Sequence, residues 1–260
     1  MDEQDLEALA DEIRRADATV AFTGAGISAP SGIPTFRDDG GVWERFEEGQ
    51  FTYGRFRSDP VGFWRDRLEL QRELFGGEYE PNAAHEALAD LGRSGHLAAV
   101  ITQNTDGLHE EAHEEVRAPA DGETAILELH GNSQRAACDD CGFRIDGDEA
   151  FERAETGELP PTCDCGGVFK PDVVLFGERL PPAVLQRSRR LARESDVFLA
   201  IGSSLAVEPA ASLPRNAAAR GATLAVINLE PTPRDDDAEY VFREDVTDVL
   251  PALRSAVESA

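Results

Sequence analysis

The first residues that could do chemistry follow a short apolar run near the start of the chain. The run TVAF leads into the turn TGAGISAPSGIPTFR, residues 23–37. A glycine turn after a strand indicates phosphate binding, because backbone N–H groups can approach an anion closely where no side chain intervenes. The Gly-Ala-Gly spacing is shorter than the G-x-G-x-x-G pattern of most dinucleotide-binding enzymes. The expected contacts in this turn are Gly24, Ala25, Gly26 and Ser28, with Arg37 supplying a positive charge.

Four further apolar runs end in polar or small residues in the same way. AAVI leads into Gln103 and Asn104, and AILEL leads into His130. VFLAI leads into residues 202–204, GSS, and TLAVI leads into residues 228–230, NLE. The carboxyl ends of parallel strands meet at one edge of a sheet, where α/β proteins bind their ligands. The five ends together therefore predict one binding site.

His130 is the candidate general base of that site. The ordinary pKa of a histidine, about 6.5, suits proton transfer near neutral pH. A histidine at a strand end can also be a packing residue, and that alternative stays open at this point. Its place opposite four other polar strand ends favours a catalytic role.

All four cysteines of the chain lie in one short segment; they are Cys138, Cys141, Cys163 and Cys165. Two close pairs about 20 residues apart are typical of a zinc ribbon, in which four thiolates surround one tetrahedral ion. The second pair, Cys-Asp-Cys, is one residue shorter than the usual motif, and free thiols or a redox pair are the alternatives. Because four protein ligands leave no position for a substrate, we expect one structural Zn²⁺.

The apolar runs alternate with helical segments, which predicts an α/β fold with a doubly wound parallel sheet. The segment PNAAHEALADLG illustrates the helices, with Gly92 as the expected stop. Residues 42–80, rich in aromatic and charged side chains, and residues 132–168, which hold the cysteines, interrupt the alternation. We expect these two insertions, a helical module and a ribbon module, to form a small domain. The large domain would comprise residues 1–41, 81–131 and 169–260.

The charge composition is unusual. Asp and Glu total 51 against 25 Lys and Arg, a formal net charge of −26, and Lys170 is the only lysine. An ordinary acidic cytosolic protein would have such a charge, whereas adaptation to very high salt also explains the scarcity of lysine. The negative field disfavours binding to nucleic acid or anionic lipid. No apolar run approaches the roughly 18 residues of a membrane span, and the N-terminus resembles no signal peptide, so we expect a cytoplasmic protein.

The strand ends and the cysteines together resemble the sirtuin family, the NAD-dependent protein lysine deacylases. The resemblance covers almost the whole chain. It rests on GAGISAPSGIPTFR, TQNTDGLHE, ELHGN, the four cysteines, KPDVVLFGE, GSSLAVEPA and INLEPTP, in the order of the family. It implies a Rossmann-like large domain, a small domain with one structural Zn²⁺, and NAD as cofactor. It also implies transfer of the acyl group from a lysine of a protein or peptide to ADP-ribose, with release of nicotinamide.

The resemblance also implies roles for individual residues. His130 would deprotonate a ribose hydroxyl, with Asn104 and Asp106 as the other catalytic residues, and Phe36 would cover the reactive sugar carbon. The substrate peptide would pair by strand addition with Val173, Val174, Phe176 and Gly177. The remaining expected NAD contacts are Gly24, Ala25, Gly26, Ser28, Arg37, Gln103, Gly202, Ser203, Ser204, Asn228, Glu230 and Val246.

Two positions bear on the choice of acyl group. Sirtuins that prefer succinyl- or malonyl-lysine are similar in having a Tyr and an Arg three residues apart on the helix that lines the acyl pocket. The matching residues here are Arg67 and Leu70. Because Leu70 is apolar and Arg67 is expected to face solvent, the pocket should favour neutral acyl groups.

Two other functions would use the same features. One is mono-ADP-ribosyl transfer to protein, which needs the same NAD pocket. The other is a binding module that senses NAD without catalysis, and both the net charge of −26 and the presence of His130 argue against it.

Overall fold

All five predicted strands lie in one parallel sheet of the computed structural model, which describes residues 1–35, 41–77, 79–115 and 124–259. The sheet has six strands in the order β3-β2-β1-β7-β8-β9. Every residue of β1, β2 and β7 is buried, as expected of central strands covered on both faces. The strands are β1 (Thr19–Thr23), β2 (Ala99–Thr102), β3 (Ala125–Glu128), β7 (Val197–Ile201), β8 (Thr223–Ile227) and β9 (Tyr240–Phe242).

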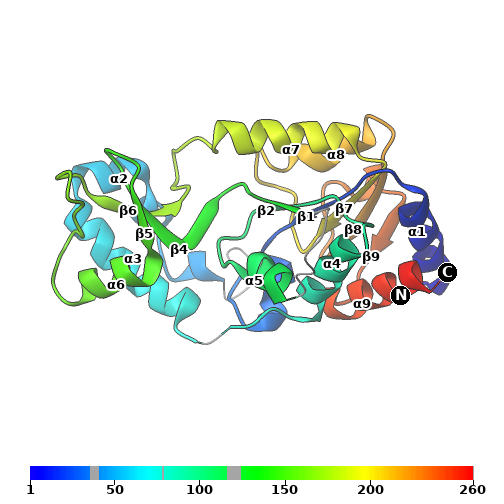
Figure 1. The fold of residues 1–260 in the computed structure, drawn as a ribbon, viewed down its shortest axis with the longest axis horizontal. Helices are drawn as coiled ribbons and strands as arrows, with labels where there is room; N and C mark the ends of the chain where they lie inside the picture. Colours follow the sequence, from blue (N-terminus) through cyan, green and yellow to red (C-terminus); the bar gives the residue numbers. More distant parts are fainter. Residues whose placement is uncertain (36–40, 78, 116–123, 260) are drawn as a thin grey trace.

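Helices cover both faces of this sheet (Figure 1). One face is covered by α1 (Glu3–Arg15), α4 (Ala83–Arg93) and α9 (Val246–Glu258), whose apolar side chains share a core with the sheet. The other face is covered by α7 (Pro182–Glu194) and α8 (Ser212–Ala218), and α5 (Leu108–Glu115) packs beside α4. The predicted doubly wound α/β architecture is confirmed.

Two details of this part differ from the prediction. Helix α4 continues through Gly92 and ends at Arg93. Gly92 is required for packing rather than for stopping the helix, since a Cβ there would lie 2.1 Å from the Oγ1 atom of Thr124. The short edge strand β9 was not predicted from the sequence.

A smaller part of the molecule lies at the opposite end in Figure 1, around an antiparallel sheet in the order β5-β4-β6. Its own core contains Phe63, Trp64 and Phe151, and the indole Nε1 of Trp64 donates to the carbonyl of Phe169 at 2.9 Å. The described residues of the segment 42–80 and the cysteine segment therefore pack together. The elements are η3 (Val42–Glu44), η4 (Glu48–Phe51), α2 (Tyr53–Ser58), α3 (Pro60–Phe75), β4 (Gly131–Cys138), β5 (Arg144–Asp146), α6 (Gly147–Glu155) and β6 (Phe169–Val173).

No helix within the described ranges is long and apolar enough to cross a membrane. Arginines pair with carboxylates at the surface, as in Arg72–Glu155 at 3.0 Å and Arg144–Asp172 at 2.9 Å. With a net charge of −26, most of the excess carboxylates have no basic side chain to pair with. Their mutual repulsion opposes folding.

Salt should therefore stabilise this protein strongly. At about 1 M salt the screening length falls to roughly 3 Å, which weakens repulsion between neighbouring carboxylates. We expect the Tm, followed by circular dichroism, to rise with potassium chloride well into the molar range. Sucrose, which stabilises proteins without screening charge, is the matched control and should raise the Tm less. A Tm that does not change with potassium chloride would contradict this account.

Candidate active site

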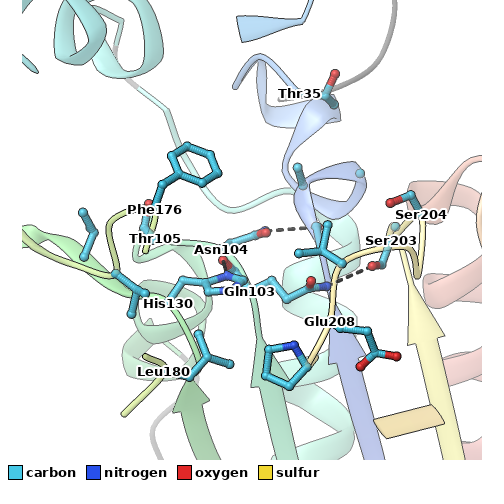
Figure 2. Close-up of a pocket in the computed structure, with 18 of the residues that line it drawn as sticks. Thr35, Gln103, Asn104, Thr105, His130, Phe176, Leu180, Ser203, Ser204 and Glu208 are labelled. Carbon is cyan, nitrogen blue, oxygen red and sulfur yellow. Dashed lines mark hydrogen bonds between the residues drawn. The ribbon is translucent and has the colours of Figure 1, made fainter. Parts of the chain in front are cut away.

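The predicted strand ends open into one cavity of about 1740 Å³. Figure 2 shows Gln103, Asn104 and His130 beside one another on its wall, with Ser203 and Ser204 at the end of β7, on the far side of β1. Ser28 and Asp106 lie just behind this wall, and Phe36 and Arg37 lie outside the described residues. The other predicted contacts that line the cavity are Gly24, Ala25, Gly26, Val173, Val174, Phe176, Gly177, Gly202, Asn228, Glu230 and Val246.

The glycine turn after β1 is held against the loop after β7. Gly24 donates its N–H to the carbonyl of Ile201 at 3.0 Å, and Gly26 donates to the carbonyl of Gly202 at 2.8 Å. A Cβ on Gly26 would lie 2.7 Å from the Cα of Gly202. The two backbones can therefore come this close only because both residues are glycines. Among the amides of residues 24–28, the one on Ala25 takes part in no hydrogen bond within the described residues. That amide, half-buried on the cavity wall, can therefore meet an anion.

Asn104 ties the turn after β2 to the glycine turn. Its Nδ2 donates to the carbonyl of Gly24 at 3.1 Å and to the Oγ of Ser28 at 3.0 Å. The hydroxyl of Ser28 in turn donates to the carboxylate of Asp106 at 2.7 Å. Burial raises the pKa of Asp106, and the hydrogen bond from Ser28 opposes that rise. Since both hydrogens of the Asn104 side-chain amide are used, the side-chain oxygen Oδ1 is the group that can accept a hydrogen bond from a ligand.

His130 stands in the bend between β3 and β4. Its Nδ1 lies 2.9 Å from the carbonyl oxygen of Gln103. Because a carbonyl only accepts, Nδ1 carries the hydrogen, and the neutral ring has its lone pair on Nε2. The backbone carbonyl of His130 accepts from Val174 at 2.9 Å, and an ion pair between Glu128 and Arg135 spans the bend. The ring is therefore held in the tautomer that a general base requires.

The strand ends beyond the glycine turn complete the wall. The amide of Gln103 donates to the Oγ of Ser203 at 2.9 Å, which joins the ends of β2 and β7. The side chain of Asn228 donates to the backbone carbonyl of Glu230 at 2.8 Å, after β8. Val246, the first residue of α9, is buried and lines the cavity. Polar groups thus follow one another along the sheet edge as the sequence predicts.

The segment after β6 also lines the cavity, and it is hydrogen-bonded to the helical module. Phe176 donates its N–H to the carbonyl of Phe51 at 3.1 Å, and its carbonyl accepts from Tyr53 at 3.0 Å. The N–H of Val174 is already used by His130. Within the described residues no hydrogen bond uses the N–H or the carbonyl of Gly177, which has a φ of +82°. An incoming strand could therefore pair at Gly177 but not at Phe176.

Two buried histidines lie behind the glycine turn and outside the cavity. The rings of His85 and His109 are 4.8 Å apart between centroids, and the Nε2 of His109 lies 2.9 Å from the hydroxyl of Thr23. Burial lowers the pKa of His85 to about 4 and lowers that of His109 well below its ordinary value. Both rings are therefore neutral near pH 7, and their place in the packing is structural.

The four cysteines converge at one end of the small sheet, and their Sγ atoms all lie within 4.8 Å of one another. The distance is 3.5 Å between Cys138 and Cys165 and 3.7 Å between Cys141 and Cys163. Four sulfurs at about 2.3 Å from a tetrahedral Zn²⁺ would be about 3.8 Å apart. The cluster therefore has the donors and the dimensions for one Zn²⁺.

The short Cys-Asp-Cys pair does not prevent this geometry. Gly166, with a φ of +89°, donates to the carbonyl of Cys163 at 2.8 Å and turns the chain tightly. A Cβ on Gly167 would lie 2.6 Å from the Sγ of Cys138. The two glycines thus let the shortened loop bring its cysteines up to the first pair.

Known proteins resemble this chain over nearly its whole length. The Sir2 family model matches residues 24–209. A protein of Haloarcula marismortui named NAD-dependent protein deacetylase is 53% identical over 255 residues, which are 97% of this chain and 95% of that protein.

Solved structures agree with the sequence comparison. A structure solved to explain the mechanism and regulation of Sir2 enzymes has a TM-score of 0.84 and 38% identity, over 99% of each chain. A Sir2 protein bound to acetylated peptide has a TM-score of 0.82 and 34% identity, over 98% of each chain. The sirtuin resemblance is therefore confirmed, and the chain belongs to the Sir2 family.

Proposed function

We propose that this protein is an NAD-dependent protein lysine deacetylase that acts on acyl-lysine proteins or peptides. The observation that carries the proposal is the position of His130, whose Nδ1 is held by the carbonyl of Gln103 on the wall of the cavity. A base with its lone pair on Nε2 and a row of polar strand ends suit a reaction on a bound nucleotide. The Haloarcula relative, named for this activity, supports the same conclusion.

The residues on the sheet edge fit NAD. The N–H of Ala25 and the hydroxyls of Ser203 and Ser204 can donate to the pyrophosphate, with Gly24, Gly26 and Gly202 shaping the turns. The carbonyl oxygen of Asn104 can accept from the nicotinamide amide. When bound, NAD supplies the ribose carbon that receives the acyl oxygen. The other proposed contacts are Phe36, Arg37, Gln103, Asn228, Glu230 and Val246, and we propose that Ser28 and Asp106, behind the wall, act on NAD through Asn104 and the glycine turn.

Within this arrangement the side chains have separate tasks. The Nε2 of His130 would take a proton from a ribose hydroxyl, and the resulting positive ring would keep its Nδ1–H bond to Gln103. Asn104 would orient the nicotinamide end, while Asp106 holds Ser28 in place. The peptide would enter beside Val173, Val174, Phe176 and Gly177, with Gly177 supplying the open backbone groups for strand addition.

The test is an acyl-peptide assay with and without NAD, in high salt. Loss of the acetyl group and release of nicotinamide should both require NAD and should occur in equal amounts. Radiolabelled NAD distinguishes the alternative, because mono-ADP-ribosyl transfer would leave label on protein without matching loss of acetyl groups. Acetyl-peptide that stays intact with NAD present would contradict the proposed function.

The acyl pocket should prefer neutral acyl groups. Leu70 lines the cavity as expected, but the expectation that Arg67 faces solvent is wrong, because Arg67 is buried and lines the same cavity. Arg67 is only 4% exposed, and burial lowers the pKa of its guanidinium to about 10. The Cζ atom of that guanidinium lies over the ring of Phe151, 5.5 Å from the ring centroid. The preference for neutral acyl groups therefore requires that the guanidinium keep its stacking on Phe151 instead of pairing with the acyl group, since an unpaired carboxylate in the pocket would cost several kcal/mol.

We therefore expect acetyl-lysine peptides to be deacylated at least about tenfold more efficiently than succinyl-lysine peptides of the same sequence. The measurement is kcat/KM at saturating NAD in high salt. Arg67→Met should leave this preference in place. Equal efficiencies for the two peptides would show that the Arg67 guanidinium, which lines the cavity, pairs with the succinyl carboxylate.

Three further points belong to the proposal. We place the protein in the cytoplasm of an organism adapted to high salt, which the excess of carboxylates and the Haloarcula relative support. We expect no direct nucleic-acid binding, because of the net charge. We also propose the two domains at the boundaries given above, with the qualification that β6 pairs with β4 of the small sheet.

A further inference from the structure

The only lysine of the chain, Lys170, lies at the start of residues 170–178, which we call the substrate loop because they include the proposed peptide contacts. All other basic residues, counting 25 Lys and Arg together, are arginines. Lys170 lies in β6, and its Nζ donates to the carbonyl of Val173 at 2.7 Å and to the carboxylate of Glu178 at 3.0 Å. The side chains are 13% and 20% exposed, so this ion pair is largely shielded from solvent.

Glu178 closes the same loop from its other end. Its Oε2 accepts from the N–H of Leu175 at 2.6 Å, and its own N–H donates to the carbonyl of Leu175 at 3.0 Å. Residues 170–178 thus form a ring closed by one lysine and one glutamate. We call this arrangement, Lys170 with Glu178, the loop clamp.

Three residues of this ring connect it to the active site and to the proposed peptide site. Val174 is bonded to the backbone of His130, and Phe176 is bonded to the helical module. Gly177, whose N–H and carbonyl make no hydrogen bond to any residue that the structure describes, directly precedes Glu178. The loop clamp therefore holds the segment from Val174, which is hydrogen-bonded to His130, to Gly177, where the substrate peptide would pair.

The clamp suits a lysine better than an arginine. An ammonium is compact and offers three donors, so it can meet a carbonyl and a carboxylate at the same point. A guanidinium is planar and larger, and its donors form a fixed fork. This difference accounts for one lysine at a shielded site in a chain that otherwise uses arginine.

We propose that Lys170, through its ammonium, and Glu178 are positioning residues that hold residues 173–177 in the shape that binds the substrate peptide. Neither residue is a reacting group. The identity of the peptide as an acyl-lysine peptide rests on the proposed function. Because the loop already has its bound shape, peptide binding does not have to order it, and the entropic cost of binding is smaller.

The test compares Lys170→Met, Lys170→Arg and Glu178→Gln with the wild type. In all three the KM for acetyl-peptide should rise about tenfold or more, because a hydrogen bond to a charged group is lost, while the affinity for NAD alone stays unchanged. The double variant Lys170→Met/Glu178→Gln should be no worse than either single one. Arg254→Met is the matched control, since it removes a partly buried ion pair with Asp90 far from the loop, and its peptide KM should stay normal.

Hydrogen exchange gives a readout that does not depend on activity. The amides of residues 173–178 should exchange at least about tenfold faster in Lys170→Met, with the large sheet unchanged. A wild type that does not deacetylate would reject the proposed function, whatever the exchange shows. Normal peptide KM in Lys170→Arg, equal loss of NAD affinity, or unchanged exchange in an active enzyme would overturn the loop clamp.

Discussion

His130→Ala should abolish deacetylation while the affinity for NAD stays within about tenfold of wild type. The reason is the tautomer: the bond from Nδ1 to the carbonyl of Gln103 leaves Nε2 as the proton acceptor, and alanine supplies none. Because the base acts after the cofactor is bound, capture of NAD should survive. Deacetylation is measured as kcat/KM, and NAD affinity by calorimetry.

The matched control for this variant is His96→Ala. His96 lies in the loop before β2, outside the cavity lining, so its removal should leave both measurements unchanged. Near wild-type deacetylation by His130→Ala would remove that residue from the mechanism. A large loss of NAD affinity would instead assign it to cofactor binding.

Cys163→Ser should release zinc and lower the Tm by more than any single surface change. The purified protein should carry about one zinc ion per chain, because the four Sγ atoms have the spacing of one tetrahedral site. The residue after Cys138 is Asp139, which pairs with Arg57 and accepts from the hydroxyl of Tyr53. Loss of the metal should therefore disturb the helical module as well as the ribbon.

Asp164→Asn is the control for this experiment, since Asp164 lies between two of the cysteines and is not part of the cluster. It should keep its zinc and its Tm. Metal content is measured by elemental analysis of freshly purified protein that has not met a chelator. A wild-type chain without zinc would reject the metal site.

Much of the site could be predicted because parallel strands end at one edge of their sheet. Each apolar run marks a strand, and the polar residues that follow, such as Asn104, His130 and Ser203, must then lie near one another. The cysteine pairs are similarly informative, since their spacing indicates a ligand set before any geometry is known.

What the sequence did not predict depends on contacts between distant segments. Position 26 requires a glycine because Gly202 packs against it, and position 92 requires one because Thr124 packs against it. No local sequence pattern reveals either contact. Arg67 looks like a surface residue in a charged segment, yet α6 covers it with Phe151. The pairing of β6 with β4, which sets the substrate loop, likewise requires the folded small sheet.

The single, shielded lysine has a consequence for an enzyme of this kind. Many proteins acquire acyl groups on exposed lysines, so a deacetylase rich in lysine would present its own surface to its own active site. Here the one ε-amine is paired with Glu178 and only 13% exposed. The enzyme therefore offers no surface lysine that could compete with its substrates, and acyl-lysine detected in a reaction mixture reports on the substrate alone.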